Sequence, residues 1–496
     1  MFRFSTDETV RQPAVAGSFY PGTPDELLKV VTEGLTAAPE PAQPCIAAIA
    51  PHAGYCYSGG TAARALASLK GQPCSRVVLL GPAHTMGFSG AALPRKAIRA
   101  FGTPLGEVPI DGESVAGLAQ HPEFSGPGRA HDAEHCLEVE LPFLQAVLDS
   151  PPVVPILIGS TTPRDDLLKI ARRLSAIVDE TTRVVVSTDF THHGHAYGFA
   201  PFPRDRHLEK RLKRLGSATV RRAAALDARG FFHQVEVSGD SVCGAKPVLV
   251  LLELLDHAFE GKGEVLEVTT SAEVSRSWDQ VVTYAAARYT GRWLPWRDAG
   301  RPSAMATLSP AEGSSLVALA RATLCSLLRH DESVAGWFEV FTPAGALLAE
   351  AGVFVSIHRR QDIRGRNERL RGCIGTIEPT HALVDAIVHN TCAAARDPRF
   401  PPLRAEELGQ VEIEVSVMSP LRPIHEPGEL QLGEHGVVIS HAGRRALFLP
   451  QIAPMTGWDR DIFLSQLALK AGLPAGCWRT GARLEVFTAQ VFSEQG

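Results

Sequence analysis

The stretch VVVSTDFTHHG (residues 184–194) runs from a short β-branched segment directly into polar residues. Two other apolar runs end in the same way, IAAIAPH (46–52) and VVLLGPAH (77–84). Each segment supplies a histidine just after its apolar part, and these are His192, His52 and His84. In an open α/β sheet, ligands bind beyond the carboxyl ends of the parallel strands. Because neutral imidazole is the commonest metal ligand and also transfers protons, the pattern predicts a metal site at one sheet edge.

The surrounding sequence favours an α/β domain. Residues 46–289 alternate β-branched runs with helix-like stretches, which is typical of a largely parallel or mixed sheet covered by helices. A helix is predicted to begin after Thr23, because Pro24 and Glu26 complete a capping box. The predicted buried strands are residues 46–50, 77–80, 153–158 and 184–186.

A change in amino-acid composition near residue 293 predicts two domains. The segment WLPWRDAGRPSAMA (293–306) is rich in Pro, Arg and small residues and has no period, so it is predicted to link a first domain (1–292) to a second (307–496). The second domain is predicted to be a smaller α+β unit. Its expected elements are a helix that begins after Ser309, strands over 352–357 and 411–417, and a helix over 382–395.

Composition excludes several classes of protein. The 496 residues carry 49 Lys plus Arg and 54 Asp plus Glu, a formal charge of −5, which does not predict nucleic-acid binding. No long apolar run predicts a secretory signal or a membrane span, so we expect a cytoplasmic protein. The nine cysteines show no C-x-x-C spacing, which argues against a disulfide framework and predicts free thiols.

A set of motifs in the first domain resembles the Memo family. The resemblance spans about residues 11–289 and rests on AVAGSFYPG (14–22), APHAGYCYSG (50–59), GPAH (81–84), TPLGEV (103–108), EHCLEVELPFL (134–144), STDFTHHG (187–194) and VCGAKP (242–247). Memo proteins are similar in fold to class III extradiol dioxygenases, whose non-haem iron is held by two histidines and one carboxylate.

The resemblance implies a set of site residues. His52 and His84 would be metal ligands, Cys243 would stand where the dioxygenases use a glutamate, His192 would be the acid/base, and Asp189 would orient it or the substrate. A thiolate keeps one negative charge but is softer than a carboxylate, so the set would suit iron(II) or copper, with zinc as a further candidate. An oxidisable sulfur would lie beside any activated oxygen, so ring cleavage is not carried over.

A second histidine motif lies nearby. His131 and His135 have an i,i+4 spacing but do not form the H-E-x-x-H pattern, which argues against zincin chemistry. Glu138 follows His135 by three residues and would share its helical face. His135 and Glu138 are therefore predicted to face the site as substrate contacts.

The second domain resembles the AMMECR family over about residues 307–492. The motifs are FVSI (354–357), LRGCIGT (370–376), DPRF (397–400), VSVMSP (415–420), FLPQIA (448–453) and KAGL (470–473). In this motif Arg371 would lower the pKa of the Cys373 thiol or bind an anion. Alternatively, Gly372 and Gly375 shape the strand and Cys373 fills a small cavity.

These resemblances lead to competing functional hypotheses. The preferred hypothesis is a redox-active, metal-dependent protein that acts on a small molecule or peptide. It would be an oxidoreductase whose metal site is related to that of the extradiol dioxygenases. Related prokaryotic proteins are similar to parts of a system that includes a radical S-adenosylmethionine enzyme, which would be a separate partner here because no cluster-binding cysteine triad is present. The alternatives are a non-catalytic module that binds a peptide in the former dioxygenase cleft, or a metal-independent hydrolase or transferase centred on Cys373.

Overall fold

The computed structural model describes residues 9–38, 45–71, 73–298, 307–329, 333–360, 370–377, 379 and 381–494. The chain divides into two compact units between residues 299 and 300, a point inside the predicted linker. Residues 299–306 of that linker lie outside the described residues. The earlier part of the linker belongs to unit 1, because the N–H groups of Leu294 and Arg297 donate to the carbonyl oxygens of Ala258 and His257.

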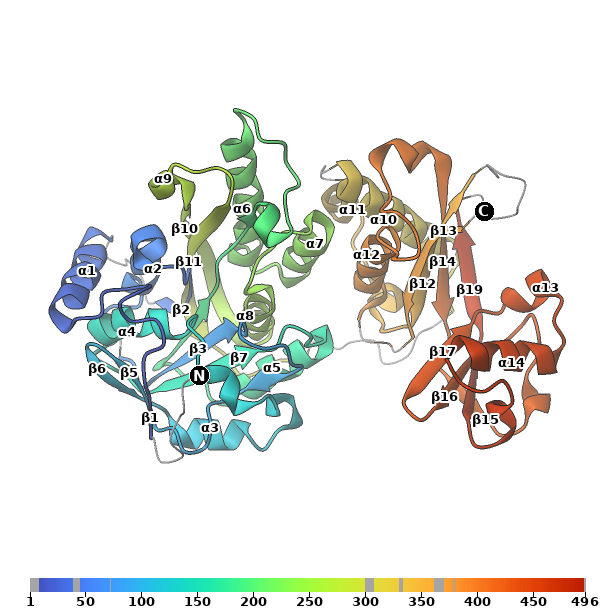
Figure 1. The fold of residues 1–496 in the computed structure, drawn as a ribbon, viewed down its shortest axis with the longest axis horizontal. Helices are drawn as coiled ribbons and strands as arrows, with labels where there is room; N and C mark the ends of the chain where they lie inside the picture. The colour runs from blue at the N-terminus through green and yellow to red at the C-terminus, as the bar shows by residue number, and fades with distance from the viewer. Residues whose placement is uncertain are drawn as a thin grey trace. The chain divides into compact units, whose positions relative to one another are not determined.

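Unit 1 is built on a mixed sheet with the strand order β10-β11-β2-β8-β3-β7-β4 (Figure 1). Its centre is parallel and consists of β2 (Cys45–Ala50), β8 (Thr182–Ser187), β3 (Arg76–Pro82) and β7 (Val153–Ile158). Its antiparallel edges are β10 (Phe259–Thr270), β11 (Val281–Trp293) and β4 (Ala91–Ala92), and β9 (His192–His193) pairs with β11. The predicted α/β fold with a largely parallel or mixed sheet is therefore confirmed.

Helices cover both faces of this sheet. Along β2, Ile49 belongs to one hydrophobic core whereas Ala48 and Ala50 belong to the other. The first core is closed by α5 (Arg164–Leu174), α6 (Leu208–Ala224), α7 (Ala228–Ser238) and α8 (Ala245–Ala258), and the second by α1 (Pro24–Ala37), α2 (Tyr55–Ala67) and α4 (Leu141–Leu148) (Figure 1). Burial on both faces explains why these strands are continuous apolar runs in the sequence.

The N-terminal segment of unit 1 is held down by a buried ion pair. Arg11 lies in β1 (Val10–Arg11), which pairs with β5 (Ala100–Thr103) next to β6 (Gly106–Pro109). Its guanidinium pairs with Glu138 and donates to the carbonyl oxygens of His131 at 3.0 Å and Glu134 at 2.5 Å. The Glu138 carboxylate also accepts the N–H groups of residues 14 and 15 and the Tyr20 hydroxyl, at 2.7 to 3.0 Å. One residue thus fixes the segment that carries His135.

Unit 2 is the predicted smaller α+β unit. One antiparallel sheet has the order β13-β12-β14-β19, made of β13 (Leu370–Thr376), β12 (Val353–Arg359), β14 (Val411–Met418) and β19 (Ala489–Ser493), with α10 (Pro310–Arg329), α11 (Ser333–Val340) and α12 (Leu383–Ala394). The other sheet has the order β15-β18-β16-β17, made of β15 (Arg422–Ile424), β18 (Arg483–Phe487), β16 (Gly436–His441) and β17 (Arg444–Phe448), with α13 (Ile452–Thr456) and α14 (Arg460–Lys470).

Two further α-helices belong to unit 1 and are its shortest. They are α3 (Gly112–Leu118) and α9 (Ala272–Ser275).

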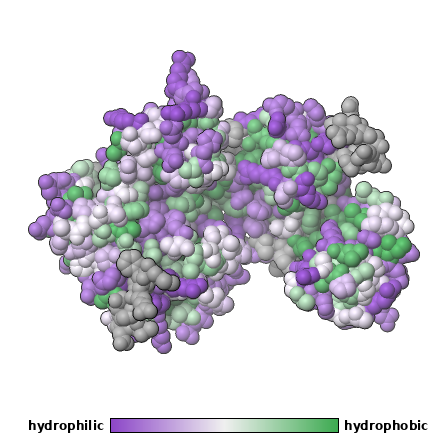
Figure 2. All heavy atoms as spheres, in the orientation of Figure 1, coloured by the Kyte–Doolittle hydropathy of each residue, from purple (hydrophilic) through white to green (hydrophobic). Residues whose placement is uncertain are grey.

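The surface mixes polar and apolar residues. Figure 2 shows hydrophilic residues spread over the face in view, including the outer end of α6, with smaller hydrophobic areas between them. Among the described residues, no helix has both the length and the apolar character that a membrane crossing requires.

Replacing Glu138 tests the buried ion pair. Glu138→Gln leaves the buried Arg11 charge without its anionic partner, and breaking a buried ion pair in this way typically costs about 3–5 kcal/mol, so the free energy of unfolding in urea should fall by about that amount. Glu260→Gln is the matched control, because the Glu260–Arg292 pair is 61% and 71% exposed and should contribute at most about 1 kcal/mol. Equal effects of the two substitutions would contradict the role assigned to Glu138.

Candidate metal centre

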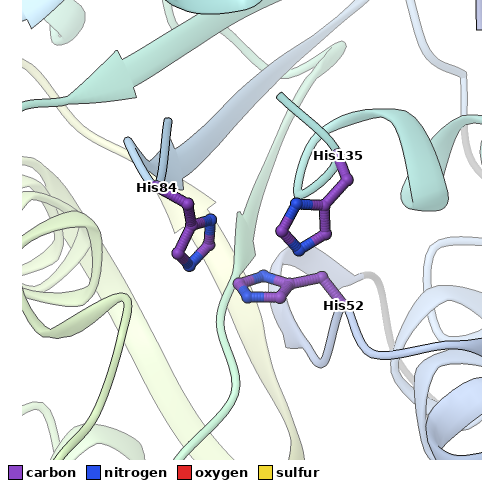
Figure 3. A group of neighbouring side chains, drawn as sticks. All are labelled: His52, His84 and His135. Atoms are coloured by element: carbon purple, nitrogen blue, oxygen red, sulfur yellow. The ribbon is translucent and has the colours of Figure 1, made fainter. Parts of the chain in front are cut away.

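The parallel register brings His52 and His84 to the same edge of the sheet. Ala50 pairs with Ser187 across β2 and β8, and Leu80 pairs with Val186 across β3 and β8, so the strands end side by side. His52 and His84 follow β2 and β3 directly. His135 joins them from the irregular segment before η3 (Glu138–Glu140), and Figure 3 shows the three rings facing one another.

The three imidazoles form a compact cluster. Their ring centroids are 4.9 to 5.5 Å apart, and one donor nitrogen from each ring lies within 4.8 Å of the other two. His52 is 2% exposed, whereas the side chains of His84 and His135 are 31% and 22% exposed, so the cluster opens to solvent on one side.

One carboxylate holds two of these histidines. Glu134 accepts from His84 Nδ1 at 2.9 Å and the His84 N–H at 2.7 Å, and it contacts His135 Nδ1 at 3.2 Å and the His135 N–H at 3.0 Å. Burial raises the pKa of Glu134, but the hydrogen bonds from His135 and His84 outweigh burial and hold this pKa well below its usual range. Glu134 is therefore an ionised anchor that takes up the Nδ1–H of both rings.

His52 is anchored differently. Its Nδ1 lies 3.0 Å from the Ser187 hydroxyl, and its backbone N–H donates to Asp189 Oδ1 at 2.9 Å. Burial lowers the pKa of His52 well below its usual range, and the imidazoles of His84 and His135 lower it further. His52 is therefore a neutral imidazole at neutral pH, the form that binds metals.

The polar partners leave the Nε2 atoms as the available donors. In all three rings Nδ1 is engaged by an outer partner, which is the usual arrangement around protein-bound metals. One nitrogen of each ring lies within 4.8 Å of the other two, and three atoms at that spacing have a common point at most about 2.8 Å from each, which must shorten to about 2.0–2.1 Å for zinc–imidazole bonds. A shift of less than an ångström in each ring would therefore bring three imidazole nitrogens to bonding distance from one metal ion. Imidazole is a common ligand of such ions, so the residues present fit a metal.

Cys243 contacts only part of this cluster. Its sulfur lies 3.2 Å from His52 Nε2 and accepts the Asp189 N–H at 3.2 Å. The sulfur does not form a set with His52 and His84 in which all donor atoms lie within 4.8 Å, whereas His135 does. Burial raises the pKa of the Cys243 thiol well above its usual value, and Asp189 raises it further. The resting thiol is therefore protonated and paired with His52.

His192 lies near Asp189, and two carbonyl oxygens hold its ring. Its Nδ1 is 2.8 Å from the Phe190 carbonyl and 3.0 Å from the Ser241 carbonyl, so Nδ1 carries the proton. Its Nε2 is then the basic atom. Burial raises the pKa of the neighbouring Asp189, and His192 opposes this effect. Asp189 accepts the His52 backbone N–H, a contact that the sequence did not predict.

The prediction that Glu138 contacts a substrate does not agree with its surroundings. Glu138 is fully buried, and its carboxylate is taken up by Arg11, Tyr20 and two backbone N–H groups. The prediction assumed that His135 and Glu138 share one α-helical face. The segment is instead irregular up to residue 137, and a 3-10 turn begins at Glu138, so helical spacing does not apply.

A second set of donors, His84, Glu134 and Cys136, also lies within 4.8 Å. It is a weaker candidate, because Glu134 is committed to both histidines. Cys136 is fully buried, and its thiol donates to the Pro82 carbonyl at 3.2 Å.

In unit 2, Arg371 and Cys373 do not act on each other as expected. The Arg371 guanidinium pairs with Glu407 at 2.8 and 3.0 Å. Burial raises the pKa of the Cys373 thiol, and the Ser356 hydroxyl that donates to the sulfur at 3.2 Å lowers it only in part.

The two glycines of the motif have packing roles. A Cβ on Gly372 would lie 2.1 Å from the Ala394 carbonyl oxygen, and one on Gly375 would lie 2.3 Å from the Phe354 ring. These contacts favour the alternative in which the glycines shape the strand.

The sequence reasoning missed one residue of the site and gave another a different role. Glu134 was considered only as part of a stretch that does not match the zincin pattern, whereas His135 was predicted to face the site as a substrate contact and lies there as a possible donor. The available signal was the Glu-His pair inside the EHCLEVELPFL motif, because a carboxylate next to a histidine is a frequent outer partner of metal ligands.

Comparisons with known proteins agree with the two units. The Memo-like protein family matches residues 11–288, and the AMMECR1 family matches residues 317–492. A MEMO1 family protein of Thermococcus kodakarensis is 35% identical over 295 residues, which cover 56% of this chain and 98% of that protein. A protein of Methanopyrus kandleri is 38% identical over 193 residues, which cover 37% of this chain and 89% of that protein.

One solved structure is also similar, that of an uncharacterized protein from Pyrococcus horikoshii. It is 32% identical, covers 38% of this chain and 94% of its own length, and has a TM-score of 0.34. With its first unit matched almost throughout by one family and its second unit by the other, the chain belongs to the Memo-like protein family and carries an AMMECR1 domain fused behind it.

Proposed function

We propose that unit 1 binds one redox-active transition-metal ion, iron(II) or copper, through the Nε2 atoms of His52, His84 and His135 and the sulfur of Cys243. The observation that carries the proposal is that three imidazoles each bring a donor nitrogen within 4.8 Å of the other two. All three Nδ1 atoms are engaged by outer partners, which supports Nε2 as the coordinating atom. Cys243 supplies the anionic donor, since its sulfur already lies 3.2 Å from His52 Nε2.

The donor types support this choice of metal. Imidazole suits iron, copper and zinc alike, and a thiolate favours the softer ions, so zinc competes for the site. Metal binding requires loss of the thiol proton, which Cys243 retains in the resting protein. When bound, a redox-active ion would supply Lewis-acid and electron-transfer chemistry to a small organic substrate.

The protein's own contribution is to hold the ligands and to move a proton. His192 presents Nε2 as a base while two carbonyls fix its Nδ1–H. Asp189 ties the His52 backbone to the Cys243 loop, because its carboxylate binds one and its N–H binds the other. We propose His192 as the acid/base and Asp189 as a positioning residue.

The proposal includes a substrate and a partner protein. A small molecule or peptide would enter at the open side of the cluster, where His84 and His135 are exposed. The fusion to an AMMECR1 domain supports a shared pathway, because linked domains act at high local concentration. A separate radical S-adenosylmethionine enzyme is the proposed partner.

Ligand substitutions test the metal site. The protein purified without oxygen is expected to hold iron or copper, which elemental analysis measures, and His52→Ala and His84→Ala should lose the metal because two imidazoles then remain. Cys243→Ser should bind more weakly and should lose the sulfur-to-metal charge-transfer band of the cobalt(II)-substituted protein.

The control for Cys243 is its neighbour Cys136. Cys136→Ser should keep both the metal and the band, because the Cys136 thiol is bonded to a carbonyl. Loss of metal in Cys136→Ser alone would favour the second donor set. A protein that takes up no iron, copper or zinc, yet still binds a peptide, would contradict the proposal in favour of a non-catalytic binding module.

His192 is tested separately from the ligands. His192→Gln should keep the metal content unchanged, since His192 Nε2 is proposed to serve the substrate. With catechol as a probe substrate, oxygen uptake by the iron(II)-loaded variant should fall by about 10²-fold or more, the usual effect of losing a general acid/base. Metal lost from His192→Gln would show instead that His192 is a ligand.

A further inference from the structure

A hydrogen-bonded chain lies behind His52 and leads away from the metal site. The Ser187 hydroxyl contacts His52 Nδ1 at 3.0 Å, Glu140 Oε1 at 2.8 Å and the Cys136 carbonyl oxygen at 2.7 Å. Ser187 and Glu140 are completely buried, and His52 is 2% exposed.

The three contacts of Ser187 limit where the protons can lie. A hydroxyl has one hydrogen to donate and two lone pairs to accept with, and here both the Cys136 carbonyl oxygen at 2.7 Å and Glu140 Oε1 at 2.8 Å are in position to accept that hydrogen. The carbonyl can never donate, whereas a carboxyl can donate when it is protonated. All three contacts are therefore hydrogen bonds at once when the carbonyl takes the hydroxyl hydrogen and His52 Nδ1 and the Glu140 carboxyl each carry a proton.

The surroundings of Glu140 agree with a neutral acid. Its Oε2 is buried and has no hydrogen-bond partner among the described residues, so an ionised group would leave a bare anionic oxygen away from water. Burial raises the pKa of Glu140 well above its usual value; the Ser187 hydrogen bond opposes this and Asp189 adds to it. Glu138, equally buried two residues earlier, has Arg11 and three further donors.

The other side of the His52 ring is compatible with the same tautomer. The Cys243 sulfur lies 3.2 Å from Nε2 and 3.4 Å from the Asp189 carbonyl oxygen. A thiol hydrogen directed at Nε2, the nearer of these two atoms, would meet a lone pair there. A ring with its proton on Nδ1 satisfies both Ser187 and Cys243.

We propose that Glu140 is a neutral carboxylic acid that serves as a positioning residue: through Ser187 it holds the proton of His52 on Nδ1 and presents the Nε2 lone pair to the site. The use of this lone pair by a metal rests on the proposed function above. The tautomer itself is a property of the metal-free protein, so it can be measured independently.

Two measurements on the metal-free protein test the proposal directly. The infrared difference spectrum between the parent protein and Glu140→Gln at neutral pH should contain the carbonyl band of a protonated carboxylic acid. Nitrogen NMR of histidine-labelled protein should show His52 with its proton on Nδ1, identified by the signal that changes in Ser187→Ala. A carboxylate band in the difference spectrum, or His52 protonated on Nε2, would overturn the proposal.

Variants separate positioning from simple packing. Glu140→Gln keeps a donor to Ser187, so it should preserve stability, the His52 tautomer and the zinc Kd of the parent protein. Ser187→Ala should populate both tautomers and weaken zinc binding by about 10- to 100-fold, the usual effect of losing an outer partner. Glu138→Gln is the matched control, since it should destabilise the fold.

The possible results distinguish the positioning role of Glu140 from the proposed metal binding, because each can fail without the other. A neutral Glu140 and the Nδ1–H tautomer in a protein that binds no metal would support the positioning network and contradict the proposed function. Zinc binding that is unchanged in Ser187→Ala, or a Glu140→Gln variant as unstable as Glu138→Gln, would contradict the positioning role whatever metal is bound.

Discussion

The site depends on the parallel register of β2, β8 and β3. Because Ala50 pairs with Ser187 and Leu80 with Val186, the three strands end in one layer, and the residues that follow them share one edge. The two cores fix this register, since successive residues of β2 pack on opposite faces. A slip by one residue would exchange the faces of a strand and move its terminal residue out of line.

Alignment of strands brings the histidines close, but it does not orient their rings. Glu134 provides the orientation for two of them by accepting the Nδ1–H of His84 and His135. Arg11 in turn holds the Glu134 carbonyl and pairs with Glu138, so a residue of the N-terminal segment fixes the position of His135. The histidine cluster is thus held by two sets of contacts: Glu134 holds the rings of His84 and His135, and Arg11 holds the segment that carries Glu134.

The ends of β2 and β3 were predictable from the sequence, because in each case a short apolar run stops just before a histidine, His52 or His84. The fold class and the predicted strands of both units followed from the same local pattern. Glu138 was not correctly placed, because α-helical spacing was assumed for a segment that is irregular and then forms a 3-10 turn, whereas His135 does face the cluster. The pairing of Arg11 with Glu138 joins residues 127 positions apart, and no local pattern encodes such a contact.

The two buried glutamates of one turn show why charge state also needs the structure. Glu138 has a guanidinium and three further donors and so exists as a carboxylate, whereas Glu140 has Ser187 alone and one oxygen without a partner. This difference determines the charge around the cluster. Glu134 contributes one negative charge beside the cluster, whereas the charge of the buried Asp189 carboxyl and of the Cys243 thiol depends on whether each has lost its proton. An ionised Glu140 would add a further buried charge with Ser187 as its only partner, an unfavourable arrangement that the proposed neutral form avoids.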